Sequence, residues 1–147
     1  MYDSRIFNGT DNIMRTIKTR LESIDKIYHI ADVHVRNVKR HKEYEIVFKR
    51  LYSYIKKTKT PNSLIYVAGD IVHAKTDMSP ELINVVSKFF RELANLAPTI
   101  VITGNHDCNL NNSYRLDALS PIVKALDHQD LHYLKDNGIY LISGIHF

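Results

Sequence analysis

Three short apolar segments dominate the central part of the sequence, at residues 26–31, 64–68 and 99–103. Each is rich in β-branched residues and stops at a polar side chain or a glycine, as a buried strand does. Amphipathic segments at residues 41–57 and 79–96 separate them, with apolar side chains at helical spacing. Strands that alternate with helices form parallel βαβ units, so the sequence predicts an α/β fold with helices packed on a parallel sheet.

The amino-terminal part of the chain has a different pattern. Ile13, Ile17, Leu21 and Ile24 follow one another at steps of four, four and three. This spacing predicts an amphipathic helix within a leader of residues 1–24.

Toward the C-terminus the pattern is less regular. A helix is expected over residues 114–126, with an interruption at Pro121. Two strands follow, at residues 131–134 and 139–143, and the Asn-Gly pair at residues 137–138 predicts a turn between them.

Length and composition limit the class of protein. The 147 residues suit one domain, here residues 25–147 after the leader. A content of 44% hydrophobic and 24% charged residues is typical of a globular chain and excludes a disordered one. No apolar run approaches the ~20 residues that span a bilayer. A single cysteine, Cys108, excludes an internal disulfide, and these features together favour an intracellular protein without membrane contact.

The charge balance is mildly basic. The chain carries 20 Lys and Arg against 16 Asp and Glu, a net charge of +4, which favours a polyanionic partner. Basic residues gather at residues 39–42 and 56–59. The alternative for residues 56–59 is a solvated helix end, where lysines offset the negative end of the helix dipole and keep the surface hydrated.

Side chains that can bind metals follow each of the three predicted strands. They are Asp32 and His34 after the first strand, Asp70 and His73 after the second, and Asn105, His106 and Asp107 after the third. Because ligands bind outside the carboxyl ends of parallel strands, we expect these side chains to meet at one edge of the sheet. Carboxylate oxygen and imidazole nitrogen suit divalent Mn, Zn or Fe. An isolated Asp-x-His is weak evidence, since aspartate often forms turns, but Gly-Asn-His-Asp directly after a strand is more specific.

The motifs ADVH, GDIVH and GNHD, spaced about one βαβ unit apart, resemble those of the calcineurin-like metallophosphoesterase superfamily. Within it, the sequence is most similar to the SbcD-type nuclease subunit, which repairs double-strand breaks together with a coiled-coil ABC ATPase. The phosphatases carry an aspartate where His73 stands here. The resemblance implies a layered α/β fold and a metal-dependent DNA nuclease in repair and recombination.

The resemblance also implies roles for single residues. Two divalent ions would be bound, most often Mn²⁺, with Mg²⁺, Zn²⁺ or Fe²⁺ as alternatives. Asp32 and His34 belong to one ion, Asp70 bridges both, and Asn105 binds the second. His106 is then the catalytic imidazole, beside the ions but not bound to them.

Three further residues near that centre are expected to assist it. His73 would contact the phosphate or orient His106. Arg36 stands where the family often has a glycine, and it either binds phosphate or is a solvated surface side chain. Asp107 is expected to support the loop or the ligands rather than to bind metal.

The remaining histidines are assigned no part in the site. His29 is expected in the core, and His128 and His132 at structural or surface positions. The family takes further metal-binding histidines from later segments, including a Gly-His-x-His element, and nothing in this sequence matches it. We therefore expect the chain to be an amino-terminal part of a longer nuclease, with an incomplete site and negligible activity alone.

The resemblance implies DNA and an SbcC-type ATPase as partners, and a homodimer through the helix at residues 79–96. Phe89 and Phe90 there exceed the single stripe that covers a sheet; the alternative is a helix buried on both sides within one chain. Two other functions stay open. One is a phosphatase or small-molecule phosphodiesterase of the same superfamily, and the other a DNA-binding or dimerising domain with a vestigial site.

Overall fold

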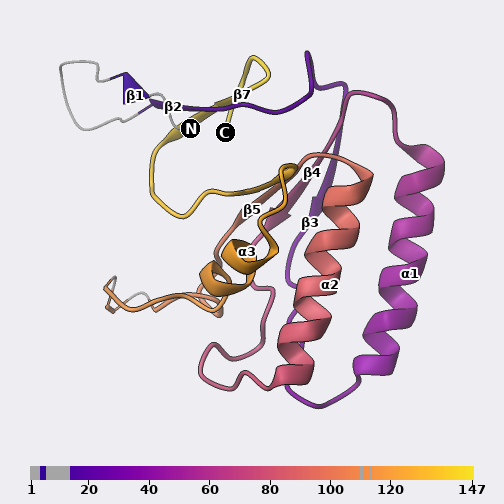
Figure 1. Ribbon diagram of the computed structural model, residues 1–147, viewed down its shortest axis with the longest axis vertical. Coiled ribbons are helices and arrows are strands. Elements are labelled where there is room, and N and C mark those ends of the chain that lie inside the picture. Colours follow the sequence, from indigo (N-terminus) through magenta and orange to yellow (C-terminus); the bar gives the residue numbers. More distant parts are fainter. Residues whose placement is uncertain (1–3, 6–13, 110, 113) are drawn as a thin grey trace.

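The computed structural model describes residues 4–5, 14–109, 111–112 and 114–147. The chain forms three layers, in which two β-sheets lie against each other and the helices cover the outer face of one of them (Figure 1). One apolar cluster lies between that sheet and the helices, and a smaller one lies between the two sheets. In these residues no helix is long and apolar enough to cross a membrane.

The sheet beneath the helices is built from strands and helices that alternate along the chain. These elements are β3 (Lys26–Ile30), α1 (His41–Thr58), β4 (Ser63–Ala68), α2 (Pro80–Leu96), β5 (Thr99–Ile102), α3 (Ser120–Leu126) and β6 (Leu131–Tyr133). The four strands are parallel and lie side by side in chain order. The predicted α/β fold with a parallel sheet is confirmed.

The α2 helix is surrounded by α1, α3 and the sheet. Ser79 caps its first turn by accepting a hydrogen bond from the backbone N–H of Leu82 at 3.2 Å. Phe89 and Phe90 are both fully buried, and the ring centroid of Phe89 lies 4.4 Å from that of Phe48 on α1. The expectation that these two side chains face a second subunit is therefore wrong, because the chain itself covers both sides of the helix.

The second sheet overturns the predicted leader helix. Its strands, in order, are β1 (Ser4–Arg5), β2 (Met14–Ile17), β7 (Ile139–Ile142) and β8 (Ile145–His146). Residues 14–17 form a strand parallel to β7, while Ile13 lies outside the described residues. Ile17 and Leu21 are buried as expected, but they pack between the sheets against Leu64 and Ile100. Four apolar positions are compatible with a helix, and also with a strand that is followed by a loop. Pairing with the distant strand β7 determines which of the two forms.

Three further expectations need correction. The α3 helix begins at Ser120, and Pro121 lies in its first turn instead of interrupting it. Residues 137–138 close no hairpin, because β6 and β7 belong to different sheets. His29 is exposed and not in the core. Its strand, β3, lies at the edge of the sheet. In the part of the chain that the structure describes, the apolar cluster between the sheets does not include His29.

Asp117 holds the loop that leads into α3. Its carboxylate accepts hydrogen bonds from the backbone N–H groups of Leu119 (2.9 Å) and Ser120 (2.6 Å). Lys135 Nζ lies 3.2 Å from Asp117 Oδ2, and the aspartate side chain is only 2% exposed. Burial alone would raise the pKa of Asp117, but the bonds from Ser120 and Lys135 outweigh burial and hold the pKa at about 2.

Replacing Asp117 by Asn should lower the free energy of unfolding by about 2 kcal/mol at pH 7, because folding lowers the carboxyl pKa from 3.8 to about 2. Since the pKa is depressed in the folded chain, this stabilisation is complete above about pH 4 and is lost as the pH falls toward 2. Urea unfolding at pH 7 and pH 3 should show the difference between the two proteins shrinking at pH 3. Asp127→Asn, at an exposed position, is the control, and an equal loss in both variants would contradict the assignment.

Candidate metal centre

The carboxyl ends of β3 and β4 are tied together by backbone hydrogen bonds that continue beyond the strands. The N–H of Asp32 donates to the carbonyl of Gly69 (3.3 Å), and the N–H of His34 donates to that of Asp70 (2.9 Å). The loop after β5 joins them, because the N–H of His106 donates to Asp70 Oδ1 (2.9 Å). The structure thus brings all three motifs to one edge of the sheet.

The backbone at this edge is strained. Asp32, His34 and Asp70 have positive φ angles of 55°, 48° and 53°. A left-handed conformation costs a residue other than glycine roughly 1–2 kcal/mol, so it persists only where the surrounding structure holds it. Such strain concentrates at functional sites, and here it falls on three of the predicted metal ligands.

Two glycines allow the loops after β4 and β5 to come into contact. A Cβ atom on Gly104 would lie 2.1 Å from Asp70 Oδ1, and one on Gly69 would lie 2.4 Å from the backbone nitrogen of Gly104. Gly69 also has a φ of 82°, which disfavours any other residue. The glycines that precede Asp70 and Asn105 are therefore required by the close approach of the two loops.

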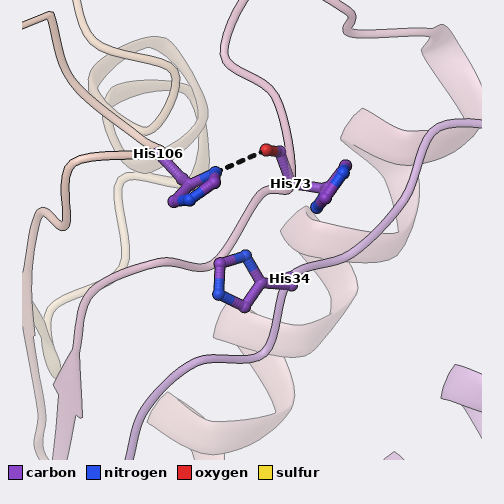
Figure 2. A group of neighbouring side chains, drawn as sticks. All are labelled: His34, His73 and His106. Carbon is purple, nitrogen blue, oxygen red and sulfur yellow. Dashed lines mark hydrogen bonds between the residues drawn. The ribbon is translucent and has the colours of Figure 1, made fainter.

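Carboxylates and imidazoles form two overlapping groups that share His34. Asp32, His34 and Asp70 have potential ligand atoms within 4.8 Å of one another, and so do His34, His73 and His106 (Figure 2). Within the first group, His34 Nε2 lies 3.7 Å from Asp32 Oδ1. Donor atoms bound to one ion at about 2 Å each lie up to about 4 Å apart. Both groups therefore have about the size of a metal site.

The ring of His106 is held in one tautomer. Its Nδ1 lies 2.7 Å from the carbonyl oxygen of His73 (Figure 2). Because a carbonyl can only accept, Nδ1 must carry a proton, and Nε2 is the atom available for chemistry. The ring of His34 meets it edge to face at 4.6 Å between centroids. His106 can thus either bind an ion or exchange a proton through Nε2.

His73 and Arg36 lie beside these rings. Desolvation lowers the pKa of His73, and electrostatic interactions with Arg36, His106 and His34 lower it further. The lowered pKa favours the uncharged form of His73. The side chain of Arg36 is exposed, and its charge acts on His73.

Asn105 is also exposed, in the loop after β5. It lines a cleft of about 470 Å³ together with Gly104, Cys108 and residues of the loop before β7. Lys75 Nζ donates hydrogen bonds to the backbone carbonyls of Asn105 (3.2 Å) and Cys108 (2.7 Å). The loop that carries Asn105 is thus held from the β4 side.

Asp107 is fully buried and binds only backbone. Its carboxylate accepts hydrogen bonds from the N–H groups of Ile71 (2.9 Å), Val72 (3.0 Å) and Gly104 (2.9 Å). Burial raises the pKa of Asp107, and the backbone N–H donors oppose that rise. The carboxylate of Asp107 therefore contacts backbone groups of both loops.

Comparison with known proteins identifies the family. Residues 25–145 match the calcineurin-like phosphoesterases. The chain belongs to this family. It is also 48% identical, over 144 residues, to an uncharacterized protein of Acanthamoeba polyphaga mimivirus. The match covers 95% of this chain and 11% of the viral protein, so the chain spans a small part of the length of that relative.

Calcineurin-like phosphoesterases are metal-dependent hydrolases of phosphate esters, and the donors in this member fit divalent ions. Asp32, His34 and Asp70 offer mixed oxygen and nitrogen donors, which suit Mn, Zn and Fe. His34 Nδ1 is buried and, within the described residues, has no hydrogen-bond partner. A buried polar atom normally has one, and a metal ion would satisfy it.

Two supporting residues were missed from the sequence. Tyr44 on α1 donates from its hydroxyl to the carbonyl of His34 at 2.7 Å, although its spacing indicated only a core position. Lys75 lies two residues beyond His73, the histidine of the second motif, but no pattern pointed to its bonds with the loop after β5. Its closeness to that motif was the one signal available in the sequence.

Asp70→Asn should weaken Mn²⁺ binding by more than about 100-fold, because loss of a ligand costs more than loss of a residue that supports one. Isothermal titration calorimetry measures the affinity and the number of ions. Asp127→Asn is a matched control, since it makes the same change at another aspartate with positive φ, 43°. Unchanged Mn²⁺ affinity in Asp70→Asn would remove Asp70 from the metal site.

Proposed function

We propose that this phosphoesterase hydrolyses the phosphodiester bonds of DNA in double-strand-break repair or recombination. The observation that carries the proposal is the meeting of two carboxylates and three imidazoles, in two groups that share His34. The third imidazole supports a nuclease, because His73 stands where the resembled phosphatases have aspartate. The proposed cofactor is a pair of divalent ions, most often Mn²⁺.

Each residue of the site has a separate role in the proposed reaction. Ions held by Asp32, His34, Asp70 and Asn105 would activate water and withdraw charge from the phosphate. His106, fixed through Nδ1 by the carbonyl of His73, presents Nε2 to hold a proton and release it to the departing oxygen. In this proposal Arg36 contacts a phosphate oxygen.

Basic residues near the centre support DNA as substrate. Lys39 and Lys42 are exposed at the start of α1, directly after the loop that carries Asp32 and His34. The second basic group, at residues 56–59, lies at the other end of the same helix, roughly 27 Å away for 18 residues at 1.5 Å each. The first group therefore supports the proposal, and the second lies away from the metal centre.

A coiled-coil ABC ATPase is proposed as partner on the resemblance alone. Co-expression followed by affinity purification tests it, and failure of the two proteins to co-purify would count against the complex.

A homodimer is also proposed, now through α1. Val47 and Tyr54 are seven residues apart, and so on one face of this helix, and they are 57% and 61% exposed. Light scattering should give the mass of a dimer for the wild type and that of a monomer for Val47→Glu. Ile83→Glu on α2, where the side chain is 40% exposed, is the control. A wild-type monomer at high concentration contradicts the dimer.

His106→Gln should lower the rate of DNA hydrolysis by roughly 10²- to 10⁴-fold, as loss of a proton donor does, and leave Mn²⁺ affinity nearly unchanged. The test uses the product of the full reading frame that contains this chain, with single- and double-stranded DNA as substrates. His146→Gln changes an exposed histidine of β8 and serves as control. Calorimetric loss of an ion in His106→Gln would make His106 a ligand instead.

The same protein assayed on p-nitrophenyl phosphate and its bis ester separates the possible activities. Cleavage of the diester and of DNA, but not of the monoester, is expected for a nuclease. Preference for the monoester would favour a phosphatase, and absence of any metal-dependent hydrolysis would favour a DNA-binding domain with a vestigial site.

A further inference from the structure

A single buried carboxylate joins the two loops that carry most of the metal centre. We propose that Asp107 is a positioning residue, which holds the loop after β4 against the loop after β5 and thereby sets the place of Asp70 and His106. The inference rests on the proposed metal-dependent hydrolysis for its consequence, but the contacts on which it is built are independent of any metal.

Both oxygens of the Asp107 carboxylate accept hydrogen bonds from backbone N–H groups. Asp107 Oδ1 accepts from the N–H groups of Ile71 (2.9 Å) and Val72 (3.0 Å), which follow Asp70. Its Oδ2 accepts from the N–H of Gly104 (2.9 Å), in the turn before His106. Both oxygens are used and the residue is 0% exposed. Asp107 therefore lies beneath the metal centre and acts on it through the backbone.

Each of the two loops supplies an aspartate that accepts hydrogen bonds from the backbone of the other loop. Asp107, from the loop after β5, binds N–H groups of the loop after β4. Asp70, from the loop after β4, accepts from the N–H of His106 in the loop after β5 at 2.9 Å. The ring of His106 adds a third link through the carbonyl of His73. A shift of either loop would therefore displace both Asp70 and His106.

Backbone hydrogen bonds also connect Asp107 to the loop of the first motif, which carries His34. Ile71, whose N–H is bound to Asp107, accepts at its carbonyl from the N–H of Val35 (2.8 Å). The carbonyl of Val35 in turn accepts from the N–H of His73 (3.0 Å). The loop that carries His34 is thus coupled to Asp107 through one residue. All three loops of the centre depend on this carboxylate.

Only a carboxylate offers acceptors on both sides of the side chain for these N–H groups. Three N–H groups point at the side chain, and an asparagine has one acceptor oxygen for them. Its NH₂ group would face either the N–H of Gly104 or those of Ile71 and Val72, and leave a buried donor unsatisfied, at a cost of about 1–3 kcal/mol. Asp107→Asn therefore separates the loops with little change in side-chain volume.

The matched control is Asp117→Asn. Asp117 is also a buried loop aspartate that accepts from backbone N–H groups, those of Leu119 and Ser120. It lies before α3 and outside both groups of potential metal ligands. A loss of stability alone should have the same effect in both variants.

The first measurement uses the metal-free chain. In Asp107→Asn, hydrogen exchange followed by NMR should show loss of protection at the amides of Ile71, Val72 and Gly104. In Asp117→Asn these three amides should lose no more protection than other core amides do, because a loss of stability acts on the whole fold. Unchanged protection in Asp107→Asn would overturn the inference, whether or not the protein binds metal.

The second measurement uses Co²⁺, whose visible absorption reports the arrangement of its ligands. Asp107→Asn should bind Co²⁺ about 10- to 100-fold more weakly than wild type, with an altered spectrum, as loss of a residue that orients ligands does. Asp117→Asn should bind with wild-type affinity and spectrum. If Asp107→Asn and Asp117→Asn both bind Co²⁺ as the wild type does, Asp107 does not position the ligands. If the wild type binds no Co²⁺, the proposed function fails. The hydrogen-exchange result then still shows whether Asp107 holds the two loops together.

A second substitution covers the case in which Asp107→Asn does not fold. Asp107→Glu keeps both carboxylate oxygens on a side chain one methylene longer, in a site with no exposed surface. It should fold, and bind Co²⁺ more weakly than the wild type with an altered spectrum, because the longer side chain pushes the loops apart. Wild-type affinity, spectrum and amide protection in Asp107→Glu would overturn the inference.

Discussion

The close contact between the loop after β4 and the loop after β5 is the constraint on which the metal centre depends. It requires glycine at residues 69 and 104, because a Cβ at either would clash with the other loop. It also requires a partner for the backbone N–H groups that the contact buries, and Asp107 provides one. Glycine gives the space and the carboxylate gives the bonds, so neither alone would hold Asp70 beside His106.

The same loops are fixed from below by the core. Val35, Ile71 and Val72 are fully buried, and they adjoin His34, Asp70 and His73 in the chain. Apolar residues pointing into the core therefore leave the metal-binding side chains on the opposite, solvent-facing side. The buried neighbours and the backbone ladder between the loops keep the positive φ angles of Asp32, His34 and Asp70 in place, a conformation that short free loops would not maintain.

The arrangement places charge in a way that suits phosphate ester hydrolysis. Carboxylates and imidazoles lie at the edge of the sheet where the loops open to solvent, and an exposed arginine, Arg36, follows them. Negative ligands attract divalent ions, and the ions together with the arginine would attract an anionic ester. The lowered pKa of His73 favours its uncharged form, which adds no charge that would repel the ions.

Local sequence pattern determined the parallel sheet and the ends of its strands. Short β-branched segments between amphipathic helices have few other ways to bury their side chains, and parallel strands bring their carboxyl ends to one edge. The pattern by itself therefore places Asp32, Asp70 and His106 at one site. Only the tertiary structure decided that residues 14–17 form a strand, that His29 is exposed, and that one carboxylate binds two loops. Each of these depends on a partner far along the chain, and periodicity in the sequence carries no record of which distant backbone groups will meet.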